Sequence, residues 1–200
     1  MRLCPPGTNS NRTFLSFCAA ILLAACGSSA PDNGGAAGSG GTSSPDPNAF
    51  VQKFKLSDNE IAGWKQDTGP GALAVFTADH LTDAIDGAAP DYTSRGCRVA
   101  MYQNLIGPGE ETCRLVAMDF GTDANATSMV QFEQNLTSAS IQVPPYDASV
   151  AIASEVLSGI TAYAHFKSSY FEVQLTGFPD LSSAVQAAAS FLGVLQTKAN

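Results

Sequence analysis

Three aspartates close together in the sequence are the residues whose types and spacing most suggest chemistry. Asp79, Asp83 and Asp86 lie four and three positions apart, which places their side chains on one side of a helical turn. Clustered carboxylate oxygens suit a hard cation such as calcium, and a hydrolytic enzyme can use them as acid and base. Such an enzyme could also use Asp119. The alternative is a solvated helix in which Asp79 stabilises the N-terminus and the other carboxylates face water.

Other signs of catalysis are few. The sequence has no Gly-x-Ser-x-Gly, no phosphate-binding Gly-x-x-x-x-Gly-Lys and no His-Glu-x-x-His motif. His165 and Glu172 are predicted to face each other on paired strands as a structural pair. Trp64 either lines a ligand groove or anchors the core. The sequence indicates no cofactor.

Cys97 and Cys113 either form a disulfide or remain buried thiols. A hairpin centred on Pro108 places them about 20 Å apart along the strands, whereas the Cα atoms of a disulfide lie within about 7 Å. A bond therefore requires a pairing register centred on Leu105 or a strongly curled loop.

The chain begins with features of an export signal. Arg2 and Arg12 precede an apolar stretch at 14–25 that is about 12 residues long, too short to span a membrane. The stretch ends in Leu23-Ala24-Ala25-Cys26, which resembles the bacterial lipoprotein signal. The resemblance implies that residues 1–25 are removed and that Cys26 is acylated, with the lipid bilayer as the partner of the anchor. It also implies a place in the cell envelope, and Gly27 favours the outer membrane if the host is Gram-negative. The alternative is an ordinary secretory signal that leaves Cys26 as a stray thiol.

Two regions follow the signal. Residues 26–48 are rich in Gly and Ser and are typical of a flexible tether, and residues 49–200 have the size of a single domain. The chain has 18 acidic and 10 basic residues, a net charge of −8. This charge gives no electrostatic basis for binding nucleic acid.

Periodicity predicts an α+β domain, with an antiparallel sheet of about five strands packed against two or three helices. The helices are expected to cover one face of the sheet and to leave the other solvated. The expected helices lie at 79–88, after an N-cap at Thr122, and after an N-cap at Asp180. The expected strands lie around 97–101, 115–117, 150–157, 160–167 and 170–175, with a further segment at 71–77 of open register.

Three short segments resemble a family of uncharacterised exported bacterial proteins, a domain of unknown function. They are Gly63-Trp64, residues 76–92 with their Asp86-Gly87 pair, and residues 118–126, which include Asp119. The resemblance implies a shared architecture and no activity, and it makes Asp86-Gly87 and Asp119 the positions at which to look for a shared cleft.

Three functions fit these observations. The leading hypothesis is a membrane-anchored binding or interaction domain exposed to the periplasm or the cell surface, with an envelope protein as a possible partner. The first alternative is a metal-dependent or hydrolytic enzyme built on Asp79, Asp83 and Asp86. The second is a structural component of the envelope.

Overall fold

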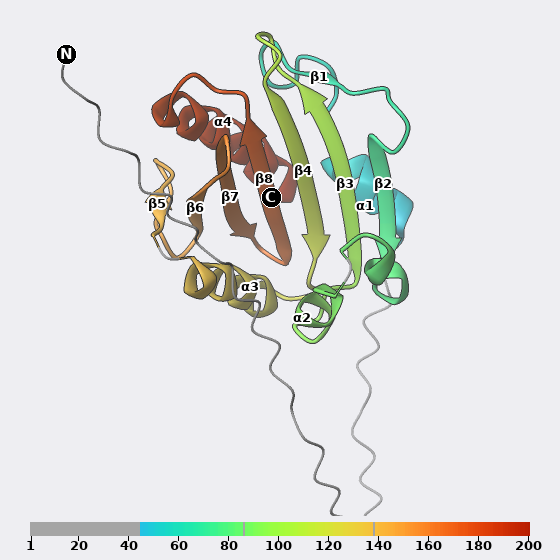
Figure 1. Cartoon of the computed structure of the whole chain (residues 1–200). Helices are drawn as coiled ribbons and strands as arrows, with labels where there is room; N and C mark the ends of the chain where they lie inside the picture. Colours follow the sequence, from blue (N-terminus) through green and yellow to red (C-terminus); the bar gives the residue numbers. More distant parts are fainter. Residues whose placement is uncertain (1–44, 86, 138) are drawn as a thin grey trace, which may run out of the picture. The chain divides into compact units, whose positions relative to one another are not determined.

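An antiparallel sheet forms the centre of the described part of the chain (Figure 1). The computed structural model describes residues 45–200 except 86 and 138, so Cys26, the signal and most of the tether lie outside the described residues. The strands follow the order β1-β3-β4-β8-β7-β6-β5, and β2 also pairs with β3. The strands are β1 (Lys65–Gln66), β2 (Leu73–Thr77), β3 (Val99–Ile106), β4 (Thr112–Asp119), β5 (Ile141–Gln142), β6 (Ala151–Val156), β7 (Gly159–Phe166) and β8 (Ser169–Thr176).

This architecture confirms the predicted α+β class and the antiparallel sheet, but the sheet has eight strands instead of about five. β1 and β5 have two residues each, which is too short for alternation to reveal them. β2 lies in the segment 71–77, for which the sequence predicts no pairing register. It pairs with β3 from Leu73↔Gln103 to Thr77↔Val99.

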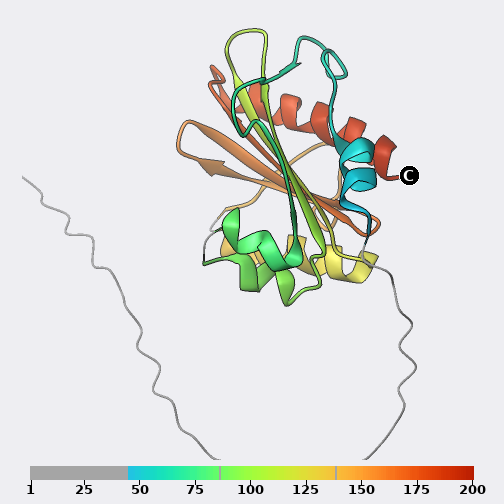
Figure 2. The same ribbon diagram turned by 90° about the vertical axis from the view of Figure 1, so that its right-hand side faces the viewer.

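Helices cover both faces of the sheet, so the prediction of one covered face is wrong (Figure 2). The helices are α1 (Pro47–Phe54), the 3-10 helix η1 (Ala78–Asp83), α2 (Ala89–Thr93), α3 (Asp123–Leu136) and α4 (Leu181–Ala199). Helices α1 and α4 pack on one face, and α2, α3 and η1 pack on the other. None of the helices in the described ranges is long and apolar enough to cross a membrane.

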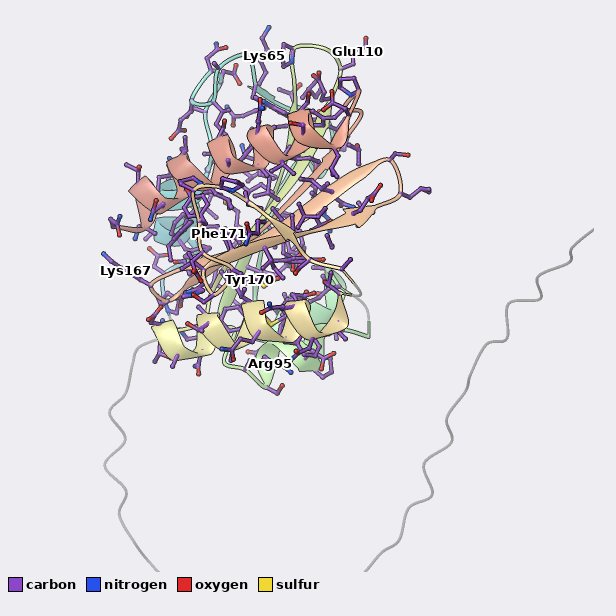
Figure 3. All side chains as sticks on the ribbon, turned by 90° about the vertical axis from the view of Figure 1, so that its left-hand side faces the viewer. Lys65, Arg95, Glu110, Lys167, Tyr170 and Phe171 are labelled. Carbon is purple, nitrogen blue, oxygen red and sulfur yellow. The ribbon has the colours of Figure 1, made fainter. Side chains whose placement is uncertain are left out.

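Neighbouring residues of β8 show that this strand contributes side chains to two hydrophobic cores, one on each face of the sheet. Phe171 points towards α4 and Tyr170 towards α3, and both are fully buried (Figure 3). The face under α3 includes the apolar Met118 and two tyrosines, Tyr102 and Tyr170, whose apolar rings end in polar hydroxyls. The polar alternation of β7 and β8, with residues such as His165 and Glu172 on this face, predicts a solvated face, although helices cover much of it.

The helix starts confirm the predicted caps. The Thr122 hydroxyl accepts a hydrogen bond from the Asn125 N–H at the start of α3. The Asp180 carboxylate does the same for the Ser183 N–H at the start of α4. The helix expected at 79–88 is instead the 3-10 helix η1, and the chain then turns at Gly87, whose φ is +68°.

The β7–β8 hairpin turns earlier than expected. Its turn begins at Lys167, whose φ is 52°, and not at the following serine. Glu172 therefore pairs with Tyr163, and His165 pairs with Tyr170. The predicted pairing of His165 with Glu172 is wrong in register. The slip keeps every side chain on its predicted face because pairing moves by an even number of positions.

Candidate ligand-binding site

A cavity of about 170 Å³ opens on the sheet face that α2 and α3 cover only in part. Three of its wall residues are tyrosines, and we call it the tyrosine pocket. The pocket is lined by Ile85, Tyr92, Tyr102, Arg114, Val116, Thr161, Tyr163, Glu172 and Gln174. The pocket thus combines aromatic walls with one basic and one acidic side chain.

Strand register brings the pocket residues together. Tyr102 pairs with Val116, Val116 with Glu172, and Glu172 with Tyr163, so that one row crosses β3, β4, β8 and β7. Arg114 begins the next row, which continues through Gln174 and Thr161. Residues two positions apart on a strand share a face, so both rows line the same pocket. Helix α2 adds Tyr92 from above the sheet.

Glu172 lies at the centre of a hydrogen-bond cluster in this pocket. The hydroxyl of Tyr92 donates to its Oε1 atom at 2.9 Å, and the hydroxyl of Tyr170 donates to the same atom at 3.1 Å. Burial raises the pKa of Glu172, and the two hydroxyls together with the charge of Arg114 offset part of that rise. The cluster joins α2 to β8 through a partly buried carboxyl group.

Glu133 of α3 is a second carboxyl group beside the first. Glu133 is only 8% exposed, and its Oε1 atom lies 3.4 Å from the Tyr92 hydroxyl oxygen. Burial first, and then the nearby Glu172, raise the pKa of Glu133 to about 7. Two acidic groups therefore meet at one tyrosine hydroxyl.

This arrangement predicts a pH-dependent stability. The folded chain holds a proton on Glu133 up to about pH 7, whereas the unfolded chain releases it near the ordinary pKa of 4.5. The free energy of unfolding should therefore fall by about 2 kcal/mol as the pH rises through this window. Urea unfolding at about pH 5 and about pH 8 measures this change. Glu133→Gln should flatten the pH dependence of the free energy of unfolding. Glu110→Gln, at an exposed turn, should leave that dependence intact. The same pH dependence in the wild type and both variants would contradict the raised pKa of Glu133.

Tyr102 carries a buried hydroxyl that has no hydrogen-bond partner among the described residues. The residue is 6% exposed, and its ring meets Phe76 edge-on with 5.6 Å between the ring centroids. The guanidinium carbon of Arg114 lies 5.1 Å from the centroid of the Tyr102 ring. A buried hydroxyl without a partner costs about 1–3 kcal/mol, so a polar ligand atom in the pocket would stabilise it.

The aspartates predicted to bind metal do not form a cluster in the described part of the chain. Asp79 and Asp83 are exposed on η1, where Asp83 contacts His80 with 3.3 Å between Oδ2 and Nδ1. A 3-10 helix has three residues per turn, so positions four apart point in different directions. Asp86 lies outside the described residues. Within the described ranges, no three His, Cys, Asp or Glu side chains come close enough to hold a metal ion.

Asp119 has a structural place at the end of β4. Its Oδ2 atom accepts a hydrogen bond from Nε of Arg98 at 2.7 Å, and its Oδ1 atom accepts one from the Ser168 hydroxyl at 3.2 Å. The carboxylate thus ties β4 to the residue preceding β3 and to the β7–β8 turn. It does not line the tyrosine pocket.

The two cysteines of the domain lie in different cores. Cys97 belongs to the cluster under α3, and Cys113 belongs to the cluster under α4. Cys113 pairs with Leu105, which centres the β3–β4 ladder on Gly109 instead of Pro108 or Leu105. The sulfurs are not bonded to each other. Burial, followed by the charge of Asp119, raises the pKa of Cys97 to about 12, so this thiol stays protonated at neutral pH.

The remaining candidates also have structural contacts. Trp64 is buried, and its ring meets Phe191 of α4 edge-on with centroids 4.9 Å apart, as expected of a core anchor. His165 lies beside Asp123 at the start of α3, with 3.3 Å between Nδ1 and Oδ1. Neither residue lines the tyrosine pocket.

Comparison with known proteins finds a distant structural likeness. No protein-family model matches the chain, and no curated protein matches it. Among solved structures, the extracellular domain of PknH from Mycobacterium tuberculosis is similar, with a TM-score of 0.42 and 15% sequence identity. The likeness covers 76% of this chain and 92% of that one. At this identity it assigns no role to any residue.

Proposed function

We propose that this chain is a lipoprotein of the bacterial cell envelope whose folded domain binds a small polar ligand in the tyrosine pocket. The observation that carries the binding function is the unpartnered, buried hydroxyl of Tyr102 beside an opening that a small molecule can enter. Native proteins leave few buried polar groups without a partner, and functional sites are one place where they do so. Arg114 and Glu172 supply the charges that can orient a ligand.

The anchor rests on the motif that ends at Cys26. Acyl chains on this residue hold a protein on a membrane because each buried methylene group contributes about 0.8 kcal/mol. The Gly/Ser-rich segment that follows would let the binding domain move above the lipid surface. Gly27 supports the outer membrane as the location in a Gram-negative host.

Cys26→Ala is expected to move the protein from the membrane pellet to the soluble fraction, because the chain then has no thiol at the acylation position. Fractionation of cells that express the full chain, followed by immunoblotting, measures the distribution. Cys18→Ala is the matched control, since it removes a cysteine within the leader that is not the acylation position, and it should leave the protein in the pellet. An unchanged pellet fraction for the Cys26 variant would refute the lipid anchor.

Tyr102→Phe tests whether the Tyr102 hydroxyl contributes to the stability of the ligand-free chain. Because the hydroxyl has no partner among the described residues, its removal should leave the ligand-free chain as stable as before or raise its free energy of unfolding by about 1 kcal/mol. Tyr170→Phe is the control, since that hydroxyl donates to Glu172, and it should lower stability by about 1 kcal/mol. Urea unfolding of the full chain measures both values.

The same variant tests binding. A panel of small polar compounds, screened by thermal unfolding of the full chain, should include compounds that raise the Tm of the wild-type protein. Tyr102→Phe should reduce that shift, and Tyr146→Phe, on the opposite face of the sheet, should preserve it. The proposed function fails if no compound raises the Tm, or if the shift is the same in the Tyr102 variant.

A further inference from the structure

The tyrosine pocket contains two opposite charges that are not paired with each other. Arg114 and Glu172 both line it, yet no ion pair joins them. Within the described ranges, Arg114 forms no hydrogen bond or ion pair, and its guanidinium carbon lies 5.1 Å from the centroid of the Tyr102 ring. A guanidinium group in such a place has its donors available for an incoming carboxylate.

The two oxygens of Glu172 differ in their surroundings. Both tyrosine hydroxyls donate to Oε1, and no described side chain or backbone group donates to Oε2. This oxygen can therefore accept a hydrogen bond from a ligand. Because a carboxylate accepts and does not donate, the matching ligand group is a donor, and a cationic donor also balances the charge.

Strand register places the two charged residues on one face of the sheet. Arg114 is two positions from Val116 on β4, and Val116 pairs with Glu172 on β8, so Arg114 and Glu172 are diagonal neighbours on one face. Diagonal neighbours lie roughly 7–8 Å apart, with their Cβ atoms somewhat closer. A molecule that carries a carboxylate at one end and an ammonium group at the other can reach both side chains across this interval.

The walls and the volume agree with such a molecule. Tyr92, Tyr102 and Tyr163 line the pocket, and aromatic rings near a cation stabilise it. The volume of about 170 Å³ corresponds to roughly five or six water molecules, which limits the ligand to a few non-hydrogen atoms.

From these observations we infer that the tyrosine pocket binds a small zwitterion of the amino-acid type, with its carboxylate on Arg114 and its ammonium group on Glu172. The inference rests on the proposed ligand-binding function and names the ligand class. The Arg114 guanidinium carbon lies 5.1 Å from the centroid of the Tyr102 ring, and the hydroxyl of that ring is a buried donor without a partner among the described residues. A ligand with only one of the two charges leaves either Arg114 or Glu172 without a partner.

Calorimetric titration of the full chain with matched probes tests the inference. β-Alanine and 4-aminobutyrate carry both charges, butyrate carries only the anion and butylamine only the cation. At least one of the zwitterions should bind roughly tenfold or more tightly than both singly charged probes, because each missing group forfeits a charged hydrogen bond. Equal affinity for butyrate and 4-aminobutyrate would overturn the inference and identify an anion site, and the proposed binding function would still stand.

Variants of the two charged pocket residues test which residue binds the carboxylate of the ligand and which binds its ammonium group. Arg114→Gln and Glu172→Gln should each weaken zwitterion binding roughly tenfold or more. Arg114→Gln should also remove the advantage of 4-aminobutyrate over butylamine, and Glu172→Gln its advantage over butyrate. Lys65→Gln and Glu110→Gln are the controls, since each removes one exposed charge outside the pocket, and both should bind like the wild type.

The controls also separate failure of this inference from failure of the fold. Arg114 is exposed, so Arg114→Gln should unfold at the wild-type temperature while it loses affinity. Unchanged affinity in a folded Arg114→Gln chain would overturn the inference. Absence of binding for every probe would overturn it as well, whereas the broader compound panel with Tyr102→Phe decides the proposed function.

Discussion

Gly159→Ala is expected to destabilise the chain by about 3 kcal/mol or more, because an added Cβ atom meets its nearest neighbour more closely here than at the other described glycines. A Cβ atom at this position would lie 1.8 Å from the backbone oxygen of Leu175 and 2.9 Å from its carbonyl carbon. Those atoms belong to β8, which pairs with β7 at this point, so relief requires a shift of the backbone and not of a flexible side chain. Urea unfolding measures the loss.

Gly193→Ala makes the matched control because the same methyl group should have the opposite effect. Gly193 lies inside α4, and the nearest atom to its added Cβ is the Tyr146 hydroxyl oxygen at 3.8 Å. Alanine favours a helix interior over glycine by about 0.5–1 kcal/mol. The two variants should therefore move stability in opposite directions. A Gly159→Ala chain as stable as wild type would show that β7 and β8 do not approach as closely as described.

Phe171→Ala is the second substitution with a large expected effect. Phe171 is fully buried between the sheet and the helices α1 and α4, with ring centroids 5.2 Å from Phe54 and 5.8 Å from Phe166. Truncation of a buried phenylalanine to alanine costs about 3–5 kcal/mol, because transfer energy is lost and a cavity remains. The loss should appear as a lower urea midpoint and a lower Tm.

The control for this variant is Phe132→Ala. Phe132 of α3 is only partly buried, and the guanidinium carbon of Arg95 lies 3.9 Å from its ring centroid. Its truncation should cost less than half as much as that of Phe171, since part of the ring already contacts solvent. Equal losses for the two variants would contradict the described core.

The parts of the fold that the sequence predicted are those with strong local signals. Thr122 and Asp180 cap α3 and α4 as expected, because the N-cap preference depends only on adjacent residues. Alternation also located the strands from β6 to β8. The helix expected at 79–88 failed because apolar spacing cannot distinguish an α-helix from a 3-10 turn that ends before Gly87.

The tyrosine pocket was beyond sequence reasoning because its parts are distant in the chain. Tyr92 is 80 residues from Glu172 and 41 from Glu133, and no local pattern relates them. One signal was available: Arg114, Glu172 and Gln174 are polar residues on strands whose other face is apolar. Such a pattern predicts a solvated face. Asp79, Asp83 and Asp86 form a pattern because they are close in sequence, whereas the carboxyl groups that meet in space come from α3 and β8.

The most direct test of the binding site is a titration followed by NMR, with the ring carbons of the five tyrosines labelled. The titrant is the compound that raises the Tm of the wild-type chain most. Binding in the tyrosine pocket predicts that the signals of Tyr92, Tyr102 and Tyr163 shift together and saturate. Tyr146, which packs beside Phe166 on the other face of the sheet, should not shift. Saturating shifts at Tyr146 alone, with the three pocket signals unmoved, would contradict the account.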